Sequence, residues 1–159
     1  MNTLYIAQKI FSLWGEYDVT NEQGQMVYHV KGVPSFLRKQ LIFDASGAQV
    51  GEIKQQFSFL PEFNIYIHGR QVGTIKSRLS LFKTNLDLNY YHWNVVGNFF
   101  AWNYQVFSQS NREIATIGVE LWHMSDHYYI RFDQEQDALP LLLLALAIDC
   151  IRDASQHSG

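Results

Sequence analysis

The sequence predicts a mainly β protein, a closed antiparallel barrel built around one hydrophobic C-terminal helix. Short runs rich in Val, Ile, Tyr, Phe and Trp alternate with polar turn residues from about position 4 to position 133, as strands and turns do. Hairpin patterns recur along this segment at nearly constant spacing. A later run is apolar on every side. We expect residues 1–159 to form one domain, because this length suits a single core.

Composition excludes several classes of protein. The 4 Trp, 9 Tyr and 11 Phe nearly balance the 27 charged residues, so the chain has enough apolar surface to fold. A single Cys rules out a disulfide framework and a multi-cysteine zinc site. The net charge of -3 argues against a nucleic-acid-binding protein, which usually carries a basic excess.

Four hairpins are predicted, and they form an internal repeat. Gly24, Gly47 and Gly69 mark the first three turns at spacings of 23 and 22 residues, as expected where a tight turn needs a positive φ. Gly51 and Gly73 occupy matching places in the returning strands and predict a bend or a close backbone contact. A meander of this length should close on itself and remove its unpaired edges. The predicted strand pairs are 17–19 with 26–30, 41–43 with 50–53, 65–67 with 72–75, and 102–107 with 114–117.

The last segment changes to a helical pattern. Asp137 can cap a helix and Pro140 is tolerated in its first turn. Residues 139–151 are apolar on every face except for Asp149, so this helix should be surrounded by the strands. The apolar run 138–148 is shorter than the roughly 20 residues needed to span a bilayer. With no signal peptide or transmembrane segment evident, we expect a cytoplasmic protein that associates with membranes peripherally if it binds lipid.

The chain resembles the YxjI-like branch of the LURP-one-related proteins, in the tubby C-terminal-like superfamily. Four segments carry this resemblance: 11–14 (FSLW) followed by 17–20 (YDVT), the turn-glycine hairpins, 126–130 (DHYYI) and 141–149 (LLLLALAID). The resemblance implies a barrel of about twelve antiparallel strands around a central helix. Tubby domains bind phosphoinositides, but a shared fold does not establish a shared function.

Charge is strongly uneven along the chain. Residues 31–83 hold eight of the twelve basic residues and only three acids, a balance of +5. The repeat places Lys54 and Lys76 at equivalent positions, and Lys76 and Arg78 share one face of a strand. We therefore name Lys54, Lys76 and Arg78 as candidate ligands for anionic phospholipid headgroups. The simpler alternative is that these cations only solvate the outer face of the barrel.

Three function classes stay open. The preferred one is a non-enzymatic binding or scaffold module that engages anionic membrane lipid. The second is a protein-interaction module, with no lipid role, that meets an acidic partner. The third, an uncharacterised enzyme, lacks any catalytic motif in the sequence. Segment 33–39 could touch a membrane, but we expect Phe36 and Leu37 to pack onto the barrel end.

The remaining titratable residues predict structure rather than chemistry. His123 and His127 are four apart, but the intervening residues resemble a turn and a zinc site needs three or four ligands, so no metal or other cofactor is expected. Cys150 should be an inert buried thiol. For Asp149, exit from the barrel, pairing with Arg152 or another base, and hydrogen bonds to strand ends are all open.

Overall fold

The structure, a computed structural model, describes residues 1–7, 15–79, 84–122 and 125–157. The described residues form twelve β-strands, two short 3-10 turns and one long C-terminal helix. The strands are β1 (Asn2–Ala7), β2 (Glu16–Thr20), β3 (Met26–Val33), β4 (Lys39–Asp44), β5 (Gln49–Gln55), β6 (Glu62–Ile67), β7 (Arg70–Leu79), β8 (Thr84–Tyr90), β9 (Asn94–Asn98), β10 (Asn103–Phe107), β11 (Glu113–Trp122) and β12 (Ser125–Phe132). The helical elements are η2 (Phe99–Ala101), η3 (Glu135–Asp137) and α1 (Ala138–His157).

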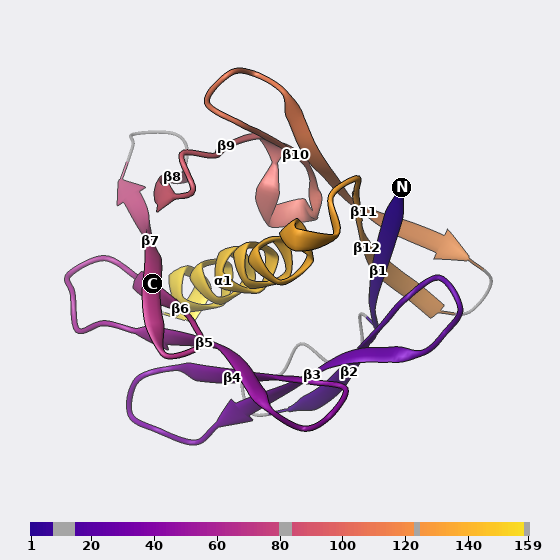
Figure 1. Ribbon diagram of the computed structural model, residues 1–159. Helices are drawn as coiled ribbons and strands as arrows, with labels where there is room; N and C mark the ends of the chain where they lie inside the picture. The colour runs from indigo at the N-terminus through magenta and orange to yellow at the C-terminus, as the bar shows by residue number, and fades with distance from the viewer. Residues whose placement is uncertain (8–14, 80–83, 123–124, 158–159) are drawn as a thin grey trace.

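The strands form one antiparallel sheet that curls around α1 (Figure 1). The sheet begins at β8, runs back through β7 to β1, continues through β12 and ends at β9. All four predicted hairpins are present, as β2–β3, β4–β5, β6–β7 and β10–β11. The barrel is nearly, but not fully, closed. The strand order ends at β8 on one side and β9 on the other, and the described residues form no ladder between these two strands.

The up-and-down course of the strands gives the barrel two different ends. One end, here called the turn end, carries the tight turns 21–25, 45–48 and 68–69. The opposite end, here called the loop end, carries the longer connections 34–38 and 56–61. The helix begins at the turn end, where the Tyr90 hydroxyl donates a hydrogen bond to the Pro140 carbonyl at 2.6 Å.

The repeated glycines have the conformations that the turns require. Gly24, Gly47 and Gly69 have φ values of 75°, 87° and 78°, which confirms the tight turns. Gly51 and Gly73 lie at close approaches, as their matching positions predict. A Cβ at Gly73 would lie 2.5 Å from the Asn89 carbonyl oxygen, and one at Gly51 would lie 3.1 Å from a methyl group of Leu143. Glycine at these positions lets the strands approach the neighbouring strand and the helix.

Helix α1 supplies the centre of the hydrophobic core. Residues 141–151 are all buried, so no face of the helix meets water over this stretch of about three turns. The sequence predicts a helix ending near 151, but the helix continues to His157, and Ala154 in this last part is still buried. No helix within the described residues is long and apolar enough to cross a membrane.

Candidate functional site

The three basic residues predicted as lipid ligands lie on the outer face of the barrel near the loop end. Lys54 is on β5, and Lys76 and Arg78 are on β7, with β6 between these strands. Their neighbours Ile53, Ile75 and Ser77 point inward and are buried. The alternation that put Lys76 and Arg78 on one face is therefore confirmed, and Lys54 shares that face.

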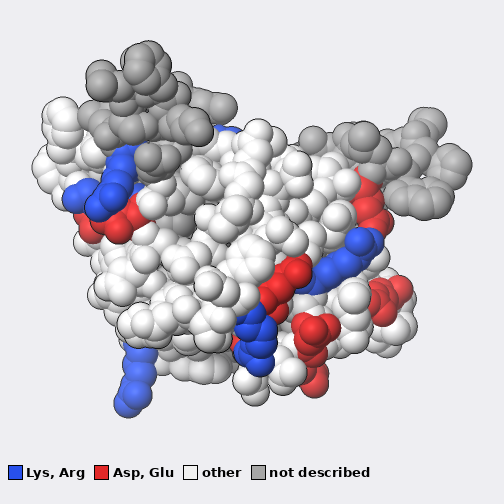
Figure 2. All heavy atoms as spheres, turned by 90° about the horizontal axis from the view of Figure 1, so that it is seen from above, with Lys and Arg blue, Asp and Glu red and all other residues white. Residues whose placement is uncertain are grey.

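Acidic side chains are interspersed among these cations. Arg78 forms an ion pair with Asp87 on β8 at 3.6 Å, and the ladder places Lys76 opposite Glu62 and Asp87. Lys54 is exposed and has no ion pair among the described residues. Basic and acidic side chains are also mixed on the side of the molecule drawn in Figure 2, where most of the basic side chains lie beside acidic ones. Lys54 is thus the most available of the three predicted cations.

The exposure of Phe36 contradicts the prediction that Phe36 and Leu37 pack onto the barrel end. Its side chain is 94% exposed, while Leu37 is half-buried. The guanidinium of the nearby Arg38 reaches toward the helix and donates to the Cys150 carbonyl at 3.5 Å. Arg38 therefore contacts α1, whereas Phe36, two residues earlier, points into solvent.

Two further exposed rings lie in the neighbouring connection and were missed from the sequence. Phe57 and Phe59 are 89% and 95% exposed in loop 56–61, between β5 and β6. In the sequence, the segment Phe57-Ser58-Phe59 lies between two predicted strands. Its place between them could have indicated that these residues belong to a loop. The loop end therefore combines three solvent-exposed phenylalanines with nearby cations.

The uneven charge along the sequence becomes a difference between the two ends. Near the loop end lie Lys31, Arg38, Lys39, Lys54, Lys76 and Arg78. At or beside the turns of the opposite end lie Glu22, Asp44, Glu113, Asp133, Glu135 and Asp137. Arg70 and Arg112 are basic residues at that turn end. The loop end also carries the acids Glu16, Glu62 and Asp87, which lie opposite Lys31 and Lys76 in the ladders, so the two ends differ in charge only by degree.

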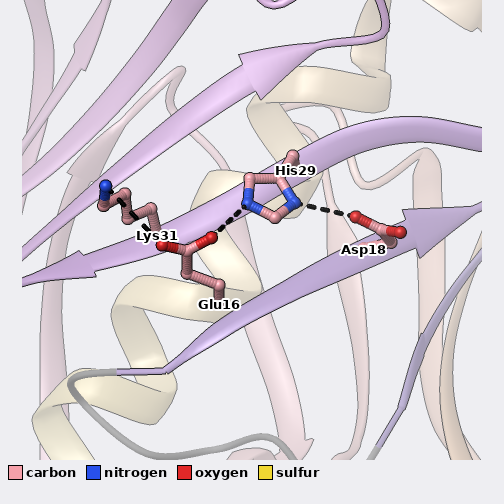
Figure 3. Close-up of polar contacts among 4 residues, drawn as sticks. All are labelled: Glu16, Asp18, His29 and Lys31. Carbon is pink, nitrogen blue, oxygen red and sulfur yellow. Dashed lines mark hydrogen bonds and ion pairs between the residues drawn. The ribbon is translucent and has the colours of Figure 1, made fainter.

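A polar cluster on β2 and β3 surrounds His29 (Figure 3). Its Nδ1 lies 2.7 Å from Asp18 Oδ1 and its Nε2 lies 3.1 Å from Glu16 Oε2, and Lys31 approaches Glu16 at 3.6 Å. Ionised carboxylates only accept hydrogen bonds, so both ring nitrogens donate when His29 is protonated. The hydrogen bond to Asp18 is the main cause that raises the pKa of His29; burial opposes it, and Glu16 adds to it.

This pKa shift predicts that His29 stabilises the fold mainly at acidic pH. Its contribution should be complete below the ordinary histidine pKa of about 6.5 and should disappear as pH rises through the raised pKa of the folded state. Chemical denaturation at about pH 5 and about pH 9 should show a larger cost of His29→Gln at the lower pH. The pH dependence of that cost should vanish in a Glu16→Gln/Asp18→Asn background; if it persists, the cluster is not its cause.

Asp149 is a buried carboxylate near the loop end of α1. It is 6% exposed, accepts a hydrogen bond from Trp102 Nε1 at 3.2 Å, and pairs with Arg152 at 2.5 Å. Burial raises the pKa of Asp149 to about 6, against the opposing effects of Arg152 and Trp102. Of the three arrangements open from the sequence, pairing with Arg152 is observed, together with a hydrogen bond from a tryptophan.

The remaining titratable residues singled out in the sequence are Cys150, His123 and His127. Cys150 is buried, and burial raises the pKa of its thiol, as expected for an inert cysteine. His127 lies on β12, while His123 lies outside the described residues. Within the part of the chain that the structure describes, no group of three metal-ligating side chains converges.

The fold and this surface define a β-barrel module with a central helix and a candidate site on its outer face. The chain belongs to the LURP-one-related family, whose model matches residues 2–149. It is 23% identical over 153 residues to a Bacillus subtilis (strain 168) protein described as uncharacterized protein YxjI, covering 95% of this chain and 94% of that relative. No solved structure shows a significant match. The YxjI-like resemblance of the sequence is confirmed, although its segment 11–14 lies outside the described residues.

Proposed function

We propose that this protein is a non-enzymatic binding module that attaches to anionic phospholipid headgroups through Lys54, Lys76 and Arg78. The observation that carries the proposal is the gathering of cations on the outer face near the loop end, among which Lys54 is exposed and has no ion pair within the described residues. An anionic membrane attracts each nearby Lys or Arg by about 1 kcal/mol. Because this attraction falls off within a Debye length of about 8 Å, it favours an orientation with the loop end toward the lipid.

The filled interior of the barrel supports recognition at the outer surface. The helix side chains that face the strands, including Leu142, Leu143 and Leu146, are at most 1% exposed. They occupy the space in which other barrels hold a small ligand. A binding partner is therefore expected to meet the outer strands and connections.

Charge reversal at the loop end tests this function. Lys54→Glu/Arg78→Glu should lose most of its retention on phosphatidylglycerol-containing vesicles at low salt, because headgroup attraction becomes repulsion. Lys76 is left intact in this variant, since it lies opposite Glu62 and Asp87 in the ladder. Co-sedimentation measures the bound fraction.

The matched control is Arg70→Glu/Arg112→Glu, which makes the same change in net charge at the turn end. This control should keep more binding than the loop-end variant. Equal binding by the two variants would mean that net charge alone governs retention, contrary to the proposal. Failure of the unaltered protein to bind anionic vesicles would also contradict it and would favour an acidic protein partner.

A further inference from the structure

We propose that the loop end enters the bilayer itself, with Phe36, Phe57 and Phe59 inserted among the lipids. This inference rests on the proposed headgroup binding and adds a second, apolar mode of attachment to it. The cations would hold the headgroups while the rings lie deeper, at the boundary of the acyl chains.

The two loops that carry these rings rise from one pair of strands. Loop 34–38 leads into β4, and loop 56–61 follows β5, the direct neighbour of β4. The Gln55 N–H donates to the Arg38 carbonyl at 2.8 Å, and the Arg38 N–H donates to Gln55 Oε1 at 3.1 Å. These hydrogen bonds hold the bases of the two loops together, so their rings leave the barrel from one place.

The exposure of the rings marks this place as an interaction surface. Phenylalanine is among the residues most often buried in proteins, and a group of exposed apolar side chains usually contacts another molecule. Here all three rings are at least 89% exposed. With so little protein around them, the rings protrude from the surface and do not line a groove.

The cations near the three rings indicate that this surface binds a lipid bilayer. Lys39 and Lys54 lie opposite each other in the ladder directly below the loops; Lys39 pairs with Glu52 at 3.5 Å, and Lys54 has no ion pair among the described residues. Anionic headgroups complement these cations, and the headgroup–acyl boundary accepts aromatic rings to a depth of roughly 5–10 Å. A folded protein partner would need matching pockets for three separately protruding rings, whereas a fluid bilayer adapts to them.

Fluorescent labelling can locate the loop relative to the lipid. Ser58→Cys puts a thiol between Phe57 and Phe59 and retains both rings, while buried Cys150 should remain unlabelled. An NBD label at position 58 should shift to the blue on anionic vesicles and be quenched by nitroxide-bearing lipid. An NBD label on Ala45→Cys at the turn end should show neither the blue shift nor the quenching. A label at position 58 that remains in water on vesicle-bound protein would overturn the inference.

Removal of the rings separates insertion from headgroup binding. Phe57→Ser/Phe59→Ser should lower the vesicle partition coefficient by about tenfold or more, because the apolar transfer is lost. The relative loss should persist at about 1 M salt, where the Debye length is roughly 3 Å. Met26→Ser, which removes a 39% exposed apolar side chain at the turn end, is the control and should bind normally.

The outcomes distinguish the two proposals. If the double Phe variant binds normally while Lys54→Glu/Arg78→Glu binds weakly, insertion is wrong and headgroup binding holds. If the unaltered protein does not bind anionic vesicles, both headgroup binding and insertion are wrong. A blue shift at position 58 that needs no vesicles and grows with protein concentration would assign the surface to a second copy of the chain, and this too would overturn insertion.

Discussion

Alanine at each of positions 141–144 is expected to lower the free energy of unfolding by about 2–5 kcal/mol. All four residues are leucines with 0% exposure. Successive residues of an α-helix point in directions about 100° apart, so these four cover every face of α1. A helix lying on the surface of a sheet would tolerate at least one such change, whereas an enclosed helix should tolerate none.

Equilibrium denaturation of the four single variants measures these costs. Leu139→Ala is the control on the same helix, because Leu139 is only half-buried and should cost less. If any of the four central substitutions left stability unchanged, one face of α1 would not need the barrel around it. The concentric core would then be the wrong description of this fold.

Arg152→Ala is expected to destabilise the protein by about 3 kcal/mol at neutral or higher pH. It removes the ion pair at 2.5 Å and leaves the 6% exposed carboxylate of Asp149 without that counter-ion. The pKa of Asp149 is already raised to about 6, mainly by burial, and loss of Arg152 should raise it further. The cost should therefore shrink as pH falls through this range and the carboxylate gains a proton.

A double-mutant cycle tests the cause of that cost. Asp149→Asn keeps an oxygen for Trp102 Nε1 but has no charge, so Arg152→Ala should cost much less when it is combined with Asp149→Asn. Unfolding free energies of the four proteins at about pH 5 and about pH 8 give the coupling. A cost of Arg152→Ala that is equal in both backgrounds and at both pH values would exclude the buried charge as its origin.

The sequence predicted the fold well where local chemistry determines structure. Turn glycines such as Gly24 and Gly47 specify their hairpins, because the required φ depends on the turn alone. The apolar pattern located α1 but placed its end too early, since residues 152–157 are polar apart from Ala154 and continue the helix without a clear hydrophobic signal. The twelve-strand architecture was implied by the family resemblance, whereas nothing in the sequence indicated that the described residues of β8 and β9 would form no ladder with each other.

The candidate site was harder to predict because it depends on contacts between distant residues. Strand alternation put Lys76 and Arg78 on one face, but the ion pair of Arg78 with Asp87 needs the register of β7 against β8. Arg38 contacts a helix carbonyl 112 residues away, and the exposure of Phe36 in the same loop likewise has no local signal in the sequence. The pairing of His29 with Asp18 was also hidden from the sequence, because a register shift between Val19 and Thr20 separates it from the register set at the turn.

Paramagnetic broadening of backbone amide signals tests the orientation on the membrane most directly. The protein would be bound to anionic nanodiscs whose lipid headgroups carry nitroxide labels, and each amide would report its approach to the surface. We expect broadening around Phe36, Phe57 and Phe59 at the loop end, with signals retained at Gly47 and Gly69 on the turn end. Broadening centred on the turn end, or spread evenly over the barrel, would contradict attachment through the loop end.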